Sequence, residues 1–330
     1  MSARVRLSVD AARALGEGAL AGLGYAAEEA RIIADHVIDA ALCGYEYSGL
    51  AKILNLPEHA RFKRPRRKVS VLRETEISTL YDGGNNVGML ALHHATEAAI
   101  AKARQAGIAL VAVTNSWVSG RSAHYVERIA RADLVAFHTA ASSRMVAPPG
   151  GARPALGTNP IAFGLPAAHD VVVFDMGTSA FMMTELMLRE RLGQELPEGV
   201  ALDAEGNPTR DPTAARLGAL LPFGGHKGFG LALMVHALGV LAGSALDLDR
   251  DNGYLFIVFK PDLLQPLAEF KRAMTALVER VKATPRRAGI AEIRIPSEHA
   301  FRHRARALRE GLEIDGAVYD ALQRLCGAAR

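Results

Sequence analysis

Short apolar runs of strand length mix irregularly with helical stretches along this chain, and this pattern restricts the folds that it can adopt. Several stretches do not alternate between strand and helix, as a regular doubly wound sheet requires. The sequence therefore predicts an α/β or mixed α+β fold. Helical periodicity occupies 8–56, 90–106, 121–132, 180–192, 264–281, 298–310 and 318–325, and strand-length runs occupy 78–81, 108–114, 134–141, 161–165, 171–175, 254–259 and 290–295.

Two glycine-containing loops lead into helical stretches. Residues 115–120 separate the 108–114 run from the 121–132 helix, and residues 223–228 precede another helix, with Lys227 at its start. Free amides at a helix N-terminus attract anions, so both loops suit a phosphate or a carboxylate. Lys227 is equally compatible with a cap or an exposed charge. Neither loop contains G-x-G-x-x-G, so the usual dinucleotide fingerprint is absent.

A third loop lies in the stretch 155–166, ALGTNPIAFGLP, which follows the prolines and glycines of 148–151. Gly157, Thr158, Asn159 and Pro160 form a turn before a short apolar run. A glycine, a hydroxyl, an amide and a rigid proline suit a backbone that approaches a polar ligand closely. An ordinary tight turn between two strands has the same residues, and the local pattern favours that alternative.

The composition is that of a globular protein with a substantial core. The 330 residues are 49% hydrophobic and 22% charged, with a formal net charge of +4. Cys43 and Cys326 are the only cysteines, so neither a disulfide scaffold nor a zinc site is indicated, and we expect no metal. The N-terminal residues lack the apolar core of a signal peptide, and a cytoplasmic setting is expected.

Two segments bear on possible partners. Residues 61–68 form a basic cluster with a single aromatic, which is more typical of a solvated linker than of a nucleic-acid site. Residues 229–246 lack formal charge and reach the lower limit of a membrane span, but His236 and several glycines and serines lie among them. We expect a buried helix that packs through its small residues, with no membrane span and no nucleic-acid partner.

Taken in order, these segments resemble the type 2 malate/L-lactate dehydrogenase family. That family includes ureidoglycolate, sulfolactate and diketogulonate dehydrogenases and cyclic-imine carboxylate reductases. The resemblance runs over nearly the whole chain. It is carried by Tyr81-Asp82-Gly83, Asn115-Ser116 with Gly120, Val146-Ala147-Pro148 with Gly150-Gly151, Gly157-Thr158-Asn159-Pro160-Ile161-Ala162, Asp175-Met176 with Thr178-Ser179, and Gly224-Gly225-His226-Lys227-Gly228.

The resemblance implies a non-Rossmann fold that binds NAD or NADP, with a mixed sheet and flanking helices. It also implies a homodimer with the active site near the interface. We expect 1–75 and 285–330 to form a helical part of the substrate and dimer region, and 76–284 to form the cofactor-binding central sheet. The implied cofactor-binding residues are Ser119, Gly120, Gly157, Thr158, Asn159, Pro160, Asp175, Thr178, Ser179, His226, Lys227 and Gly228.

The chain departs from the family at the usual catalytic positions. Relatives carry a Ser-His-Gly, a histidine in an Asn-Ser-x-His loop and an aspartate before Pro-x-Gly-Gly. Here those positions hold Tyr47-Ser48-Gly49, Val118 and Ser143. A valine transfers no proton, so the family's acid–base residue is missing, and the chain is predicted to be a divergent member with a remodelled site.

One set of replacements lies near the first glycines. Tyr47 or Tyr45 is a candidate proton donor, with Ser48 beside it. Lys52 either lowers the pKa of the tyrosine or binds a substrate carboxylate, as the aligned arginine does in relatives. We therefore predict Tyr47 and Ser48 as catalytic, and Tyr45 and Lys52 as substrate-binding.

A second set lies on the helix that follows residue 120. Arg121 and His124 are three residues apart and share a helix face, next to Tyr125, so they suit the orientation of an acidic substrate. His124 is predicted to be catalytic and Arg121 to bind substrate. A packing role for the histidine and the tyrosine is the alternative.

The predicted function is an NAD(P)-dependent oxidoreductase that transfers hydride to or from the carbon alpha to a carboxylate. Its substrate is a 2-oxo acid, a 2-hydroxy acid or a cyclic imino acid. The missing histidine at 118 favours an imine or an unusual oxo acid, because an imine nitrogen arrives already protonated. The alternative is a catalytically inactive member that binds nicotinamide cofactor or ligand in a regulatory or structural role.

Overall fold

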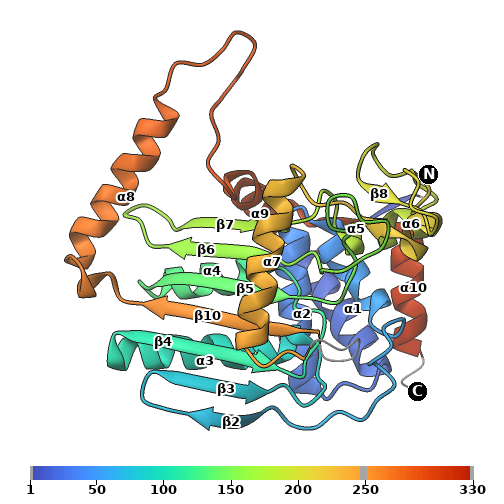
Figure 1. Ribbon diagram of the computed structural model, residues 1–330, viewed down its shortest axis with the longest axis horizontal. Helices are drawn as coiled ribbons and strands as arrows, with labels where there is room; N and C mark the ends of the chain where they lie inside the picture. Colours follow the sequence, from blue (N-terminus) through green and yellow to red (C-terminus); the bar gives the residue numbers. More distant parts are fainter. Residues whose placement is uncertain (1–2, 246–250, 328–330) are drawn as a thin grey trace.

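A seven-stranded mixed sheet forms the centre of the computed structural model, which describes residues 3–245 and 251–327 (Figure 1). β3 and β4 are parallel, and every other neighbouring pair is antiparallel. The strands are, in spatial order, β2 (Ser70–Glu74), β3 (Ser78–Asp82), β4 (Ile108–Thr114), β10 (Gly253–Phe259), β5 (Val135–Ala141), β6 (Ile161–Leu165) and β7 (Val172–Met176).

Helices cover both faces of this sheet. α3 (Gly88–Ala106) and α4 (Ser122–Arg131) lie behind it in Figure 1, and α7 (His226–Leu241) crosses in front over β5 and β10. Small residues bring α7 close to the strands, because a Cβ on Gly239 would meet the Ala141 side chain at 2.2 Å. The mixed sheet with flanking helices confirms the predicted fold class.

A second core lies at one end of the sheet. It consists of α1 (Val9–Gly22), α2 (Ala27–Leu42), α10 (Gly316–Gly327) and the 3₁₀ turns η1 (Glu46–Ser48) and η2 (Leu50–Asn55). Ser8 caps α1 by accepting a hydrogen bond from the Ala11 amide at 3.1 Å. β1 (Arg4–Leu7) pairs with β11 (Leu312–Asp315), which joins the two ends of the chain. The predicted division at 75 and 285 stays a prediction.

The remaining elements lie at the edges. α5 (Met183–Arg191), α6 (Pro212–Leu217), β8 (Ala201–Leu202) and β9 (Ala219–Leu220) form a small cap with its own apolar cluster. α9 (Glu298–Glu310) packs on α2. After η3 (Pro261–Leu263), α8 (Leu267–Lys282) extends away from the body with no buried residue (Figure 1).

The structure differs from the expected elements at several places. Residues 290–295 have no regular structure, because their alternation of apolar and charged residues meets no neighbouring strand. β1 was not expected, since its four residues belong to no longer apolar run. β2 was not expected either, because all of its residues are exposed and it follows the basic cluster directly.

The prediction of a buried helix within 229–246 is wrong for one face of α7. Val235 and Gly239 are buried against the sheet, whereas Leu233, Met234 and Leu241 are 44%, 56% and 74% exposed. Leu246 lies outside the described residues. Across the part of the chain that is described, no helix combines the length and the apolar composition needed to cross a membrane.

Candidate active site

A cleft of about 960 Å³ opens between the η1–η2 turns, the loop that precedes α4, the end of β7 and the start of α5. Its size suits a small-molecule or cofactor site, which typically measures about 300–1,000 Å³. Residues from the second core and from the sheet both contribute to its walls. The predicted site residues that line it are Tyr45, Tyr47, Ser48, Lys52, Ser119, Gly120, Arg121, Thr158, Pro160 and Asp175.

Hydrogen bonds hold the four predicted cofactor loops side by side. Thr178 donates its amide to the Thr158 carbonyl at 2.8 Å, and Phe223 donates to the Thr178 carbonyl at 3.0 Å. The Ala123 amide, at the start of α4, donates to Asp175 Oδ2 at 2.8 Å. Loops that are far apart in the sequence therefore converge beside one cleft. Their contact with a cofactor stays a prediction.

Several predicted cofactor residues support these loops from behind the cleft. Asn159 is fully buried, accepting from the Ser142 amide at 3.0 Å and donating to the Ala232 carbonyl at 2.9 Å. A Cβ on Gly157 would meet Ser142 Oγ at 2.2 Å, so only glycine permits this approach. Thr178 and Ser179 are also buried and bond to neighbouring carbonyls.

The last predicted loop lies at the N-terminus of α7. His226 and Lys227 are exposed there and do not line the cleft. Gly228 is buried, and a Cβ on it would meet the Phe223 carbonyl at 2.3 Å and the Thr178 carbonyl at 2.7 Å. Gly228 thus allows the helix start to sit directly against the loop that follows β7.

Lys52 is a buried cation with unused bonding capacity. It lines the cleft from η2 and is 4% exposed, and its ammonium has no hydrogen bond or ion pair with residues 3–245 or 251–327. Burial lowers the pKa of Lys52 to about 8, against the opposing field of Asp175. Burial likewise raises the pKa of Asp175, which the amide of Ala123 and the charge of Arg121 oppose. An anionic ligand group would satisfy the Lys52 ammonium.

Tyr45 and Tyr47 form an aromatic wall of the same cleft. Their rings meet edge to face, with centroids 6.1 Å apart. Burial raises the pKa of both phenols, and the carboxylate of Glu185 raises that of Tyr47 further. The expectation that Lys52 lowers the pKa of a tyrosine is therefore wrong, and the Tyr47 hydroxyl stays protonated at neutral pH.

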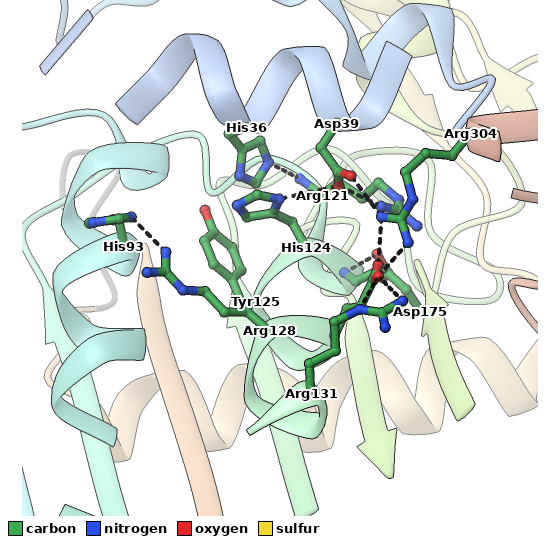
Figure 2. A network of polar contacts seen from close by, with 12 residues as sticks. His36, Asp39, His93, Arg121, His124, Tyr125, Arg128, Arg131, Asp175 and Arg304 are labelled. Carbon is green, nitrogen blue, oxygen red and sulfur yellow. Dashed lines mark hydrogen bonds and ion pairs between the residues drawn. The ribbon is translucent and has the colours of Figure 1, made fainter. Parts of the chain in front are cut away.

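Arg121 and His124 belong to a polar network around Asp39 of α2 (Figure 2). Asp39 Oδ2 lies 3.1 Å from Arg121 Nη1 and 3.2 Å from His124 Nδ1, and Oδ1 lies 2.9 Å from Arg304 Nη1. Burial alone would raise the pKa of Asp39, but the His124 hydrogen bond and the two arginines hold it well below its usual range. Arg304 also pairs with Glu127.

The network separates the two predicted helix residues. Arg121 lines the cleft and stacks over Tyr45, with its guanidinium carbon 5.1 Å from the ring centroid. His124 points to Asp39 and is not part of the cleft lining (Figure 2). The structure therefore brings Tyr45, Tyr47, Lys52 and Arg121 together and leaves His124 behind Arg121.

His36, which the sequence did not indicate, shapes the loop before α4. Its Nε2 accepts a hydrogen bond from the Arg121 amide at 2.8 Å. Gly120 has a φ of +82°, and a Cβ there would meet His36 Nε2 at 2.1 Å. Burial, His124 and Lys52 lower the pKa of His36 well below its ordinary value, so its ring is neutral and can accept.

Comparisons with known proteins identify the family to which the chain belongs. Residues 7–323 match the malate/L-lactate dehydrogenase family. The chain belongs to that family. It is 34% identical over 316 residues to L-sulfolactate dehydrogenase of Methanothermobacter thermautotrophicus, covering 92% of this chain and 90% of the relative.

Another relative is a reductase. The Delta(1)-pyrroline-2-carboxylate/Delta(1)-piperideine-2-carboxylate reductase of Pseudomonas putida is 38% identical over 260 residues, covering 74% of each chain. Among solved structures, a dehydrogenase from Sinorhizobium meliloti superposes with a TM-score of 0.89 at 29% identity, covering 98% of this chain and 99% of that one. These relatives are dehydrogenases and reductases, and this family member is an oxidoreductase.

Arg61 fixes the loop that carries the family's Asn-Ser pair. Its guanidinium donates to Asn85 Oδ1 at 2.8 Å, the Ser116 carbonyl at 3.1 Å and Asn115 Oδ1 at 2.5 Å. It is 5% exposed, so the expectation of a solvated linker is wrong at this residue. The loop needs such support, because Asn115 and Val118 have φ angles of 52° and 56°, where a valine is strained.

We expect Arg61→Ala to destabilise this oxidoreductase by about 2 kcal/mol, because it leaves buried acceptors unpaired. Cofactor affinity should fall with it, since the 115–120 loop loses its anchor. Urea unfolding and a cofactor titration measure the two effects. Lys63→Ala is the matched control, as Lys63 is an exposed neighbour in the same basic cluster. Equal stability of the two variants would contradict the assigned role of Arg61.

Proposed function

We propose that this family member is an NAD(P)-dependent oxidoreductase that transfers hydride to or from the carbon alpha to a carboxylate. The observation that carries the proposal is Lys52, a nearly fully buried lysine of the cleft lining whose ammonium has no partner among the described residues. It provides one anion-binding subsite in the cleft that Tyr47 and several predicted cofactor residues also line. Family membership supports a nicotinamide cofactor, NAD or NADP.

The residues present fit such a cofactor. Ser119, Gly120, Thr158, Pro160 and Asp175 present small side chains, a hydroxyl and a carboxylate along one wall of the cleft. Gly157 and Gly228 approach neighbouring backbone closely, whereas nothing lies within 4 Å of a Cβ on Gly225 at the exposed start of α7. We assign these loops to the cofactor, with Lys227 near its phosphates. When bound, the cofactor supplies or accepts the hydride.

The protein's own groups then orient the substrate and handle the proton. Lys52 holds the substrate carboxylate, and Arg121, fixed by Asp39 and His36, limits the orientation of the bound acid. The Tyr47 hydroxyl, which burial keeps protonated, donates a hydrogen bond to a substrate oxygen or accepts one from the N–H of a protonated imine. Val118 excludes water from the position where relatives carry a histidine.

Imine reduction suits this arrangement better than ketone reduction. A phenol with a raised pKa is a weak acid, so it transfers a proton to a developing alkoxide poorly. An imine nitrogen can bind already protonated and needs only orientation by Tyr47. The similarity to the pyrroline-2-carboxylate and piperideine-2-carboxylate reductase supports this preference.

Turnover with each nicotinamide cofactor tests the proposal. NADH and NADPH should bind, and at least one cyclic imino acid or 2-oxo acid should be reduced. Tyr47→Phe should lower kcat about 10- to 100-fold with little change in KM, in the range expected for a lost proton-transfer or orienting group. Cofactor binding without turnover of any such acid would instead support the inactive, regulatory alternative.

We also propose that the protein forms a homodimer through α7 and α8. Leu233, Met234 and Leu241 make an exposed apolar face on α7, and Leu277 and Val281 are about 40% exposed on the projecting α8. Exposed apolar surface of this kind is typical of interfaces. Sedimentation should give twice the chain's 35.2 kDa mass. Leu241→Glu should lower the measured mass toward that of the monomer. An unchanged mass would contradict the proposed interface.

A further inference from the structure

Among the described residues that line the cleft, Lys52 is the one buried cation whose side chain has no partner in the protein. The buried Arg121 is held by Asp39 at 3.1 Å, and the exposed Arg144 is paired with Asp251 at 2.9 Å. Arg121 is further fixed by its stacking over an aromatic ring. Lys52 is buried and has no such partner.

The remaining cationic side chains of the cleft wall either form hydrogen bonds or ion pairs with the protein or are exposed to solvent. Arg61 directs its donors to the two asparagines and the carbonyl described above. Arg216 bridges Glu58 at 3.0 Å and Glu190 at 2.8 Å. Arg153 is exposed at the rim, where solvent screens its charge.

Apart from Asp175 and Thr184, the lining near the end of β7 and the start of α5 is apolar. Methionine side chains are flexible and adapt to apolar groups, but they offer no donor to an anion. A carboxylate buried against them without a cation or a donor carries a large desolvation penalty. The apolar side chains of this wall are Phe174, Met176, Met182, Met183 and Met187.

We propose that the substrate is a monocarboxylate, whose carboxylate binds Lys52 and whose apolar body lies against the methionine wall. This inference rests on the proposed function and specifies its substrate class. A second anionic group, carboxylate or sulfonate, meets no unpaired buried cation among the described residues of the cleft lining. In this respect the chain differs from relatives named for malate and sulfolactate, since those acids carry two anionic groups.

A matched pair of acids tests the proposal without requiring turnover. Pentanoate and glutarate have the same chain length and differ in a terminal methyl or carboxylate. In calorimetric titrations of the full chain with saturating nicotinamide cofactor, pentanoate should bind at least tenfold more tightly. Equal or tighter binding of glutarate overturns the proposal, and so does a lack of pentanoate binding.

The corresponding substrates separate this proposal from the proposed function. 2-Oxopentanoate should be reduced with at least tenfold higher kcat/KM than 2-oxoglutarate. Binding of pentanoate without turnover of any oxo or imino acid would remove the enzymatic function and leave the ligand class standing. Turnover with preference for 2-oxoglutarate would keep the function and overturn the ligand class.

A gain-of-charge variant tests the methionine wall itself. Met187→Lys adds an ammonium on α5, and Met187→Leu keeps the wall apolar. The lysine variant should reduce the preference for pentanoate over glutarate at least threefold, whereas the leucine variant should keep it. An unchanged preference in Met187→Lys would show that the body of the ligand lies elsewhere. If the lysine variant does not fold, the wild-type titrations still decide.

Discussion

Lys52→Met should lower kcat/KM for the carboxylate substrate about 100-fold, mainly through a higher KM. Among the residues that the structure describes, Lys52 is the buried cation of the cleft whose side chain has no partner. Loss of one member of a buried charge pair costs about 2–5 kcal/mol of binding. The interaction exists in the bound ground state, so KM should change more than kcat. Steady-state kinetics measure both.

The stability of the same variant distinguishes this role from a structural one. Methionine matches lysine in length and removes a buried charge, so the free energy of unfolding should stay constant or rise. A variant that loses activity only because it unfolds more easily would contradict the assignment. Urea unfolding of the wild type and of Lys52→Met gives the answer.

Lys52→Arg is the matched control and also carries a pH signature. It should keep substrate binding within about tenfold, because it retains a cation. Burial lowers the pKa of Lys52 to about 8, so wild-type KM should rise above that pH as the ammonium loses its proton. Arginine stays charged, and the rise should disappear in Lys52→Arg. A rise of equal size in both would assign it to another group.

The sequence predicted the elements of the sheet well, because most of its strands are apolar runs bounded by glycine or proline. β10 and β5 lie in the middle of the sheet and have near-continuous apolar character, as buried strands do. β2 escaped prediction because every residue of it is exposed, so no alternation marks it. Residues 290–295 show the reverse error, since alternation alone does not supply a strand partner.

The candidate site was predicted where its residues lie in glycine-rich loops, and missed where it depends on residues from helices. Tyr47, Lys52 and Asp175 were predicted with the help of the family resemblance, and the structure brings them into the lining of one cleft, while their roles stay predictions. His36 occupies an ordinary helix position whose role depends on a chain segment 85 residues away. Arg61 is hidden among exposed basic neighbours, because composition does not indicate which one is buried.

Asp39 shows what such a missed residue contributes. It joins Arg121 of the cleft to His124 and Arg304, so three helices meet at one carboxylate (Figure 2). Arg121 reaches the cleft as a fixed side chain because Asp39 and His36 hold its guanidinium and its amide. The predicted helix residues are thus linked to the site through a residue on α2 that no local pattern marks.

We expect Asp39→Asn to lower the free energy of unfolding by about 3 kcal/mol at pH 7, because it leaves Arg121 and Arg304 with less compensation in a partly buried site. Asp35→Asn on the same helix is the matched control. Asp35 pairs with Arg13 at the surface, where both side chains are 38% exposed, so its loss should cost less than about 1 kcal/mol. Equal losses in the two variants would contradict the importance of the network.

The loss of unfolding free energy caused by Asp39→Asn should also become smaller at low pH. The folded pKa of Asp39 is depressed, so its contribution is complete above the unfolded pKa of about 3.9 and is lost as pH falls towards the folded value. The difference in unfolding free energy between wild type and variant should therefore be constant from pH 7 to about 5 and shrink below pH 4. Urea unfolding at pH 7, 5, 4 and 3 measures it. A difference that stays constant to pH 3 would mean that the variant acts through packing rather than through the charge that orients Arg121.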